Sequence, residues 1–478
     1  MSVNTMTFEQ SAAYLTALYE EATGQSPAIK ITNTADFTSV GTTLLQGGVD
    51  PIISALAQVL DRTIFAMRVY NKKFDDITVD EIRFGAITRK VNYIDNPLDT
   101  ADDRLSLTDG YSVDPYVVKK PKVLQTNFYG ATQYQDSITI FRDQLDSALK
   151  SADEFGRFLS SLMTHIDNKH KQVEEAEARG IIANFIAAKK LADTPNAINV
   201  LQAYYDETGT VLTPANMFSN DKYSDFTRWL AGFLTTLTDK LAERTVNYHM
   251  NIAGSPLMRF TDGENLRKYI SANVANYLDT MVAAGLYNPD RLSVITNGMR
   301  KMTFWQNIDN PYTVKATPAY LDVSDGTVAE ALSAVQVDNI IGVLFDRDAL
   351  GMVKRSTWSG ATPFNPRGGY YNIFWHWTQS TWNDFTENFI LLYADTVIVP
   401  SVTLNKSTTT IAEGANETLT ATTVPADATV TWASSDTTVA TVDDDGKVVG
   451  VAAGSATITA TIEVSGRTYT DECEVTVS

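Results

Sequence analysis

The chain has 478 residues, and its 38 basic and 57 acidic residues give a formal net charge of −19. At roughly 100–200 residues per domain, that length predicts two to four domains. The acidic excess argues against a protein whose main task is to bind nucleic-acid phosphates, because such binding needs a basic surface. The single cysteine, Cys473, excludes an internal disulfide and a cysteine-based metal cluster, so we expect it to be a buried small hydrophobe.

Membrane and export signals are missing from the sequence. The apolar run at residues 389–394 ends at Asp395, far short of the roughly 18 apolar residues of a membrane span. The first ten residues have neither the basic nor the apolar region of a secretory signal. We therefore expect a soluble protein with no membrane contact that is made and folds in a cytoplasm.

Three segments of different character open the chain. Residues up to about Gly48 are rich in Thr, Ser, Gly and Asn with little regular apolar pattern, which predicts an extended or partly mobile arm. Residues 51–69 have apolar positions at helical spacing, which predicts a helix with one buried face. Residues 68–125 carry ten basic and ten acidic residues. Such balanced charge is typical of an ordinary solvent-exposed surface. It is also typical of a long, strand-bearing loop that contacts a neighbouring molecule with complementary charges.

The clearest helix follows. Ser151 and Glu154 form a capping-box pattern, which predicts reciprocal hydrogen bonds at the start of the helix. An apolar stripe from Phe155 to Val173 predicts that the helix continues to about Arg179. Roughly 28 residues make a rod of about 40 Å, which is long for an enzyme core. Gly180 is expected to interrupt it, with a continuation over residues 181–191.

The rest of the large block mixes helix and strand. Apolar spacing predicts a helix over residues 265–284 and buried strands over 292–296 and 340–345. Aromatic, strand-like segments at residues 367–378 and 389–399 close the block. The predicted class is α+β.

Composition changes near Pro400. Residues 401–478 are rich in threonine, carry three basic and eleven acidic residues, and alternate polar and apolar positions with period two. Six or seven short strands separated by turn signals predict an all-β sandwich. The carboxylates Asp443, Asp444 and Asp445 precede Gly446 and are interpreted as a solvated hairpin turn in preference to a calcium site.

A specific motif runs through this module. It reads Val430-Thr431-Trp432-Ala433-Ser434-Ser435-Asp436, then Val439-Ala440-Thr441-Val442, then residues 446–458 with Gly446, Gly450 and Gly454. In this order the segment resembles the bacterial immunoglobulin-like group 2 domain over essentially all of residues 401–478. We expect Trp432 to anchor the core between the two sheets and the three glycines to permit turns or close backbone approach.

Catalytic patterns are missing. His165 and His170 are five residues apart on the predicted helix, so they cannot hold one metal from one face and are expected on the helix surface. His376 lies among tryptophans and is expected to be a core or interface histidine. Asp346 and Asp348 share a turn, and there is no phosphate loop, nucleophile elbow or HExxH motif. We expect no enzyme, and no catalytic, cofactor-binding or metal site.

A second resemblance covers most of the chain. Its motifs are Tyr129-Gly130-Ala131-Thr132-Gln133-Tyr134-Gln135-Asp136-Ser137-Ile138, the long helix from Ser151, and Asn365-Pro366-Arg367-Gly368-Gly369-Tyr370-Tyr371 with its aromatic continuation just before the module. In this order they resemble the major capsid proteins of short-tailed, protein-primed phages. The resemblance implies the Hong Kong 97 capsid fold over residues 1–400, followed by the immunoglobulin-like domain.

The implied parts are an N-arm (1–50), an E-loop (68–125), a peripheral domain with a long spine helix (127–191) and a mainly axial domain (225–400). The implied function is self-assembly into hexamers and pentamers of an icosahedral phage head that encloses DNA, with residues 401–478 displayed outside. Some relatives cross-link an E-loop lysine to an asparagine. Lys72, Lys73 and Lys90 are available here, but no motif fixes a partner, so we expect no cross-link.

The resemblance leaves other partners and functions open. Scaffolding protein and portal are candidate partners, packaged DNA would be touched only non-specifically, and the module is a candidate for binding cell-surface glycans. The location implied is the virion, after assembly in the host cytoplasm. Alternatives are a phage tail or receptor-binding adhesion protein, then a bacterial surface adhesin, and last a hydrolytic enzyme.

Overall fold

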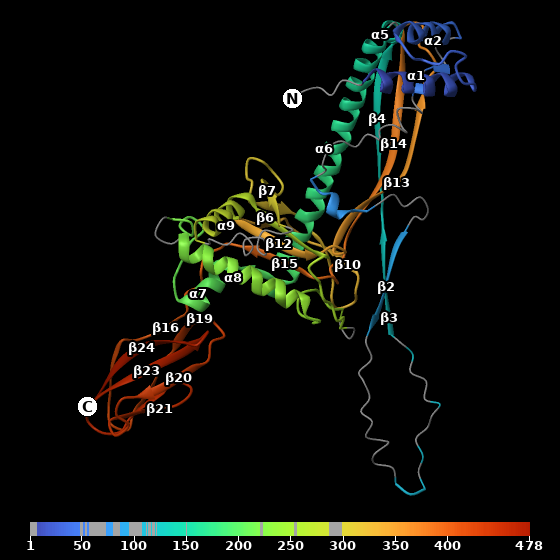
Figure 1. Ribbon diagram of the computed structural model, residues 1–478. Coiled ribbons are helices and arrows are strands. Elements are labelled where there is room, and N and C mark those ends of the chain that lie inside the picture. The colour runs from blue at the N-terminus through green and yellow to red at the C-terminus, as the bar shows by residue number, and fades with distance from the viewer. Residues whose placement is uncertain are drawn as a thin grey trace.

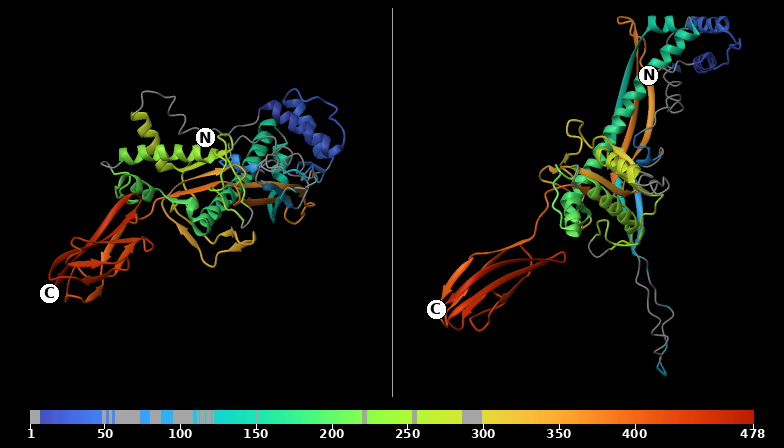
Figure 2. Two further views of the ribbon diagram at one scale, coloured as in Figure 1. Left: turned by 90° about the horizontal axis from the view of Figure 1, so that it is seen from below. Right: turned by 60° about the vertical axis from the view of Figure 1, so that its left-hand side comes forward.

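The computed structural model describes residues 7–47, 51, 52, 55, 56, 73–79, 87–94, 108–110, 112, 116, 120, 122–149, 151–219, 223–252, 256–285 and 299–478. The protein is elongated (Figure 1): one helix and a long sheet join a distal tip to a compact body, and a hairpin and a C-terminal β-module project from that body. Figure 2 shows the C-terminal module extending from the body in two further views.

The N-terminal segment contains two helices, so the predicted extended arm is wrong for residues 8–23 and 34–46. Helix α1 (Phe8–Thr23) begins with a capping box between Thr7 and Gln10, and α2 (Thr34–Gln46) begins at Asn33, whose side chain accepts from two amides. Their apolar residues are few but fall on one face, and this face packs at the distal tip. Its fully buried members are Leu15, Leu18, Phe37, Val40 and Leu44.

Only four residues of the predicted helix 51–69 are described. Pro51, Ile52, Ala55 and Leu56 are helical, and the last three are buried in the distal core. The remainder lies outside the described residues. After it, a 3-10 turn (Asp75–Ile77) leads into β1 (Thr78–Val79), which pairs in parallel with β13 (Leu350–Ala361).

The predicted strand-bearing excursion contains a hairpin. Strand β2 (Ile87–Ile94) pairs antiparallel with β3 (Lys122–Tyr129), from Ile87 opposite Tyr129 to Ile94 opposite Lys122. Its far end points away from the body (Figure 1). Gly130, at φ 112°, separates β3 from β4 (Thr132–Phe141).

Helix α6 (Ala152–Ala192) has 41 residues and spans about 60 Å at 1.5 Å per residue. Ser151 is its N-cap, but its side chain makes no capping hydrogen bond, so the predicted capping box is wrong. The interruption predicted at Gly180 is also wrong. The turns after Gly180 are held by core packing on both sides, and this tertiary burial outweighs the weak helix propensity of one glycine.

The long sheet has the strand order β1-β13-β14-β4. Strands β13 (Leu350–Ala361) and β14 (Tyr370–Asn383) run beside α6 between the distal tip and the body (Figure 1). We call this sheet, together with α6, the stalk. Alternate residues of β14, among them Tyr371, Ile373 and Trp375, are buried in the distal core together with α5 (Arg142–Ala148) and the start of α6. The aromatic strand predicted at 367–378 is therefore confirmed, beginning at Tyr370.

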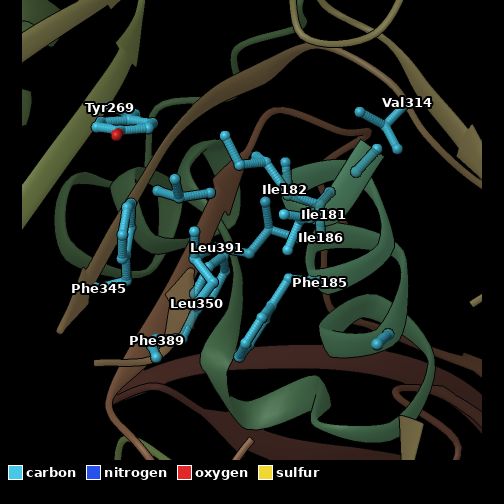
Figure 3. Close-up of a cluster of buried hydrophobic side chains, with 14 of the residues drawn as sticks. Ile181, Ile182, Phe185, Ile186, Tyr269, Val314, Phe345, Leu350, Phe389 and Leu391 are labelled. Atoms are coloured by element: carbon cyan, nitrogen blue, oxygen red, sulfur yellow. The ribbon is translucent and has the colours of Figure 1, made fainter. Parts of the chain in front are cut away.

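The body is a second sheet, ordered β5-β15-β12-β6-β7, covered on both faces. Strand β12 (Ile340–Asp346), which confirms the predicted strand at 340–345, is fully buried at its centre, and β15 (Phe389–Tyr393) lies beside it. Phe185 of α6 packs on one face against Phe389, and Phe345 belongs to the same cluster (Figure 3). Helices α7 (Val200–Thr208), α8 (Tyr223–Ala242) and α9 (Ala272–Gly285) supply the core on the other face.

The helix predicted over 265–284 begins too early. Residues 266–271 form β6 (Leu266–Ser271), which pairs with β12 and buries Tyr269 and Ile270. The apolar spacing of these residues is compatible with a helix or a strand, and pairing with β12 selects the strand. The predicted strand at 292–296 lies outside the described residues. The remaining short elements of the body are η2 (Thr194–Asn196), β5 (Ala197–Asn199), β7 (Met299–Met302), β8 (Val314–Ala316), β9 (Ala319–Leu321), β10 (Val328–Glu330) and β11 (Val335–Val337).

The C-terminal module is the predicted β-sandwich, with nine strands where six or seven were predicted. They are β16 (Ser401–Leu404), β17 (Thr408–Ile411), β18 (Asn416–Thr418), β19 (Ala421–Val424), β20 (Val430–Ser434), β21 (Ala440–Val442), β22 (Lys447–Gly450), β23 (Gly454–Val464) and β24 (Arg467–Val477).

Cys473 and Trp432, the two residues of this module that were predicted to be buried, differ in how deeply they are buried. Cys473 is fully buried, as predicted, and burial raises the pKa of its thiol. Trp432 of β20 packs against the core and its ring lies against Gly446, beside the other sheet, so its predicted place between the sheets is confirmed, although the side chain is not fully buried. The exposed Asp443 carboxylate accepts from the Asp445 and Lys447 amides, which gives the predicted hairpin turn before Gly446 at φ 76°.

Candidate assembly surfaces

The described residues contain no group of three or more His, Cys, Asp or Glu placed to hold a metal ion, and none of their helices is long and apolar enough to cross a membrane. The features that distinguish this chain are instead extended surfaces: the β2–β3 hairpin, the outer face of the stalk sheet and the attachment of the C-terminal module.

A cluster of ion pairs fastens the hairpin to the body, near the ring contact of Phe128 with Trp382. Lys90 of β2 inserts its ammonium between two buried carboxylates, at 2.6 Å from Asp384 and in an ion pair with Glu387, which also lies 3.3 Å from Arg259. Burial alone would lower the pKa of Lys90, but the two carboxylates outweigh it and raise that pKa. Lys90 is thus a structural ion-pair partner at the root of the hairpin.

The other two candidate lysines are less informative. Lys73 is half-exposed and pairs with Glu175 at 3.3 Å, and Lys72 lies outside the described residues. The expectation that no cross-link forms stays a prediction. No sequence motif pointed to the Lys90 cluster, because its carboxylates lie almost 300 positions away in the chain.

The outer face of the stalk sheet carries aromatic rings. His376 stacks on Trp358 with ring centroids 3.9 Å apart and an interplanar angle of 11°, and Phe374 lies next to His376 along the same face. Trp358 is 58% exposed. This arrangement excludes the core role considered for His376 and leaves the interface role as a proposal.

His170 is on the opposite face of the same sheet. Its ring lies 4.2 Å from that of Trp377, and its Nε2 is 3.7 Å from the buried carboxylate of Asp136. The predicted helix-surface position is therefore wrong for His170, because α6 presses that side chain against β14 and β4. The side chain of His165 lies outside the described residues.

The C-terminal module is held at several points on α7. Gln202 of α7 holds the linker between body and module, residues 395–400. Its side-chain oxygen accepts from the Ile398 amide at 2.7 Å, and its side-chain nitrogen donates to the Ile398 carbonyl at 3.2 Å. From the module, Arg467 donates to the Tyr205 carbonyl at 2.6 Å, and the hydroxyls of Tyr205 and Tyr469 are 2.8 Å apart. A cation at the carboxyl end of a helix is favoured by the helix dipole, so the contact suits α7.

We expect Arg467→Ala to loosen the module without unfolding it. The substitution removes the hydrogen bond to the α7 carbonyl and the cation that lies 5.4 Å from the Tyr205 ring centre. Small-angle scattering should show a larger and more variable distance between the module and the body, and protease should cut the 395–400 linker faster. Lys447→Ala, an exposed cation on β22 of the same module, is the control and should change neither measurement.

The chain is elongated, with a long helix packed on a sheet, a hairpin and a separate C-terminal module. These features are typical of a structural subunit with extended contact surfaces. A family model for the Phi29-like phage major capsid protein matches residues 15–393, and a model for the bacterial Ig-like domain (group 2) matches residues 398–471. The chain therefore belongs to the Phi29-like phage major capsid protein family. The predicted fold class, an α+β capsid chain followed by an all-β module, is confirmed.

Solved phage structures are similar at a distance. The capsid of Staphylococcus phage Andhra matches with a TM-score of 0.43 and 12% identity, covering 68% of this chain and 84% of that one. A structure of the head fiber and inner core protein of native bacteriophage P68 matches with a TM-score of 0.45 and 10% identity, covering the same shares. Both scores lie below 0.5, so the family assignment rests on the sequence match.

Two curated proteins match over short segments. An alpha-L-arabinofuranosidase of Bifidobacterium longum is 32% identical over 141 residues, and an uncharacterized protein of Clostridium acetobutylicum is 36% identical over 87 residues. The matches span only 13% and 9% of those proteins. These local similarities carry no activity over to this chain.

Proposed function

We propose that copies of this major capsid protein join as hexamers and pentamers into an icosahedral head around the DNA genome, after assembly in the host cytoplasm. In this proposal residues 1–50 act as the N-arm, 68–125 as the E-loop, 127–191 as the peripheral domain and 225–400 as the main part of the axial domain. The capsid role itself, and with it a place in the virion, follows from the family.

The observation that supports overlap between copies is the solitary hairpin. Within the described residues, β2 and β3 pair only with each other, and an isolated two-stranded hairpin is marginally stable in water. Val91 and Val123, one on each strand, are 48% and 50% exposed. A neighbouring copy that covers the hairpin would supply the burial that its own chain does not.

We expect that replacing residues 95–121 with a short Gly-Ser turn leaves the body folded but abolishes shell formation. The root of the hairpin, including Lys90, is kept, so the circular dichroism spectrum and the melting temperature should change little. Sedimentation and negative-stain microscopy should show subunits without closed shells. Closed shells of normal size would contradict the role of this segment. Deleting residues 401–478 is the control, because a decoration module is dispensable for closure.

We also propose that the C-terminal module is displayed on the outside. Its strong acidity and its attachment through one short helix suit an exposed position. A protease that cleaves the 395–400 linker should therefore release the module from intact, DNA-filled particles. Release only after the particles are opened would place it inside. Contact with cell-surface glycans is a further proposal for this module, testable by glycan binding to intact particles.

The remaining partners follow from the same proposal. A charge of −19 suits a wall that touches packaged DNA only non-specifically, since it does not attract phosphate. Scaffolding protein and portal are proposed partners, and the chain is proposed to catalyse no reaction. The tail or adhesion alternative rested on the module alone, whereas the family match covers residues 15–393.

A further inference from the structure

Lys268 is a lysine on a core-facing side of the body sheet. It lies on β6 between Leu266 and Ile270, and because side chains alternate along a strand, all three project to the same face. Leu266 and Ile270 belong to the core that α7, α8 and α9 cover. The sheet neighbours of Lys268 are Leu344 of β12 and Met299 of β7. A lysine is unusual at such a place, because lysines are almost never buried without a partner.

Lys268 is partly buried, and it has no such partner. Its ammonium makes no hydrogen bond or ion pair with any residue that the structure describes. By contrast, the buried Lys189 pairs with Asp193 at 2.5 Å. Burial lowers the pKa of Lys268, and the charge of Asp239 on α8 offsets this only in part. A larger fraction of this amine is therefore uncharged than of an ordinary lysine, and an uncharged amine is a nucleophile.

The side chain of Lys268 borders a hollow between α8 and the sheet. The hollow has a volume of about 50 Å³. Since one water needs about 10–15 Å³, it has room for a group of a few heavy atoms. Its walls include Leu234 and Met299, which are apolar, and Thr235 and Thr238, whose hydroxyls donate to backbone carbonyls of α8.

This lining suits a small uncharged group better than a bound anion. The two threonine hydroxyls already donate elsewhere, and the carboxylate of Asp239 also borders the hollow. An anion would therefore find one cation, no free hydroxyl donor and a like charge nearby. A short acyl group attached to the Lys268 nitrogen would instead fill the space and remove the unpaired charge from the margin of the core.

We propose that Lys268 is an acylation site, at which the hollow accommodates a short acyl group supplied by an acyl phosphate. The lone pair of the amine attacks the carbonyl carbon of the donor. A C–N bond forms and the C–O bond to phosphate breaks, with its electron pair leaving on the phosphate. The nitrogen loses one proton, which the departing phosphate takes up. The product is an uncharged amide, and no enzyme activity of the chain is required.

Acetyl phosphate is the probe that tests this site. The full-length subunit is incubated with it near neutral pH, and acetylation of each lysine is followed over time by peptide mass spectrometry. Lys268 should react about threefold or more faster than Lys240, an exposed lysine on α8. This advantage should shrink as the pH approaches about 10, where ordinary lysines also lose their charge. Equal or slower reaction of Lys268 near neutral pH would overturn the proposal.

A pair of variants tests the role of the hollow. Thr235→Leu fills it and should lower the acetylation rate of Lys268 about threefold or more, with the rate of Lys240 unchanged. Thr236→Leu is the matched control, because Thr236 is the next residue of α8, is exposed and does not line the hollow. An unchanged rate for Lys268 in Thr235→Leu would contradict entry of the acyl group into the hollow.

A third variant tests whether the charge of Lys268 has a structural use. Lys268→Met removes an unpaired cation from an apolar margin, so the melting temperature should stay the same or rise. A clear fall would mean that the ammonium is needed for folding, which would overturn the site. These measurements use the isolated subunit, so their outcome is independent of shell formation.

Discussion

Phe185→Ala is expected to lower the free energy of unfolding by about 3–5 kcal/mol, the largest loss we expect from a single core substitution in this chain. Phe185 is fully buried where α6 crosses the body sheet. Its ring stacks on that of Phe389 with centroids 4.1 Å apart (Figure 3), and its centroid lies 4.6 Å from that of Phe385. Truncation removes these contacts and leaves a cavity between two rigid elements that cannot close it.

Chemical denaturation of the purified subunit measures this loss. Leu191→Ala, on the same helix at a position 43% exposed, is the control and should cost less than about 1 kcal/mol. Because Phe185 joins the helix to the sheet, the variant should also show faster amide exchange in β12 and β15. Equal losses for the two variants would mean that α6 is not anchored to the body at this point.

Lys90→Met is expected to destabilise the subunit by about 3 kcal/mol, because it leaves the buried Asp384 and Glu387 without their shared cation. Arg259, 3.3 Å from Glu387, compensates in part. Amide exchange should accelerate first in β2 and β3, since Lys90 ties the hairpin to the body. Lys73→Met removes an exposed pair with Glu175 and should cost less than about 1 kcal/mol.

The pH dependence gives this prediction a second check. The folded state raises the pKa of Lys90 above its ordinary value of 10.5, so its contribution is complete below that value and is lost as pH rises through the higher folded pKa. The difference in unfolding free energy between wild type and Lys90→Met should therefore be constant near neutral pH and shrink in strong alkali. A difference that grows with alkali would contradict the ion-pair account.

The elements that the sequence predicts best are those whose pattern has one physical solution. Residues 340–345 are apolar at nearly every position, as a strand buried on both faces must be, and β12 is that strand. The alternation of residues 401–478 likewise predicts short strands with one buried face, and these strands form the β-module. The long helix is predicted because its apolar stripe repeats over many turns.

The sequence predictions are wrong where contacts with residues distant in the chain determine the local structure. Residues 266–271 fit either a helix or a strand until β12 lies beside them. The N-terminal helices have caps at Thr7 and Asn33 that the sequence displays, but their apolar faces are short and obtain their burial from the distal tip.

The surfaces were only partly predictable. The charged excursion was recognised from composition, and its described residues include the β2–β3 hairpin. Its anchor at Lys90 and the His170 contact with Trp377 each join segments that are far apart in the chain, so no local pattern marks them.

Electron cryomicroscopy of the virion, with this chain traced in the density, tests the central claim most directly. The account predicts many copies in a closed icosahedral shell, grouped as hexamers and pentamers, with each β2–β3 hairpin lying on a neighbouring copy and each C-terminal module on the outer surface. A few copies confined to the tail, with the shell built from another protein, would contradict it.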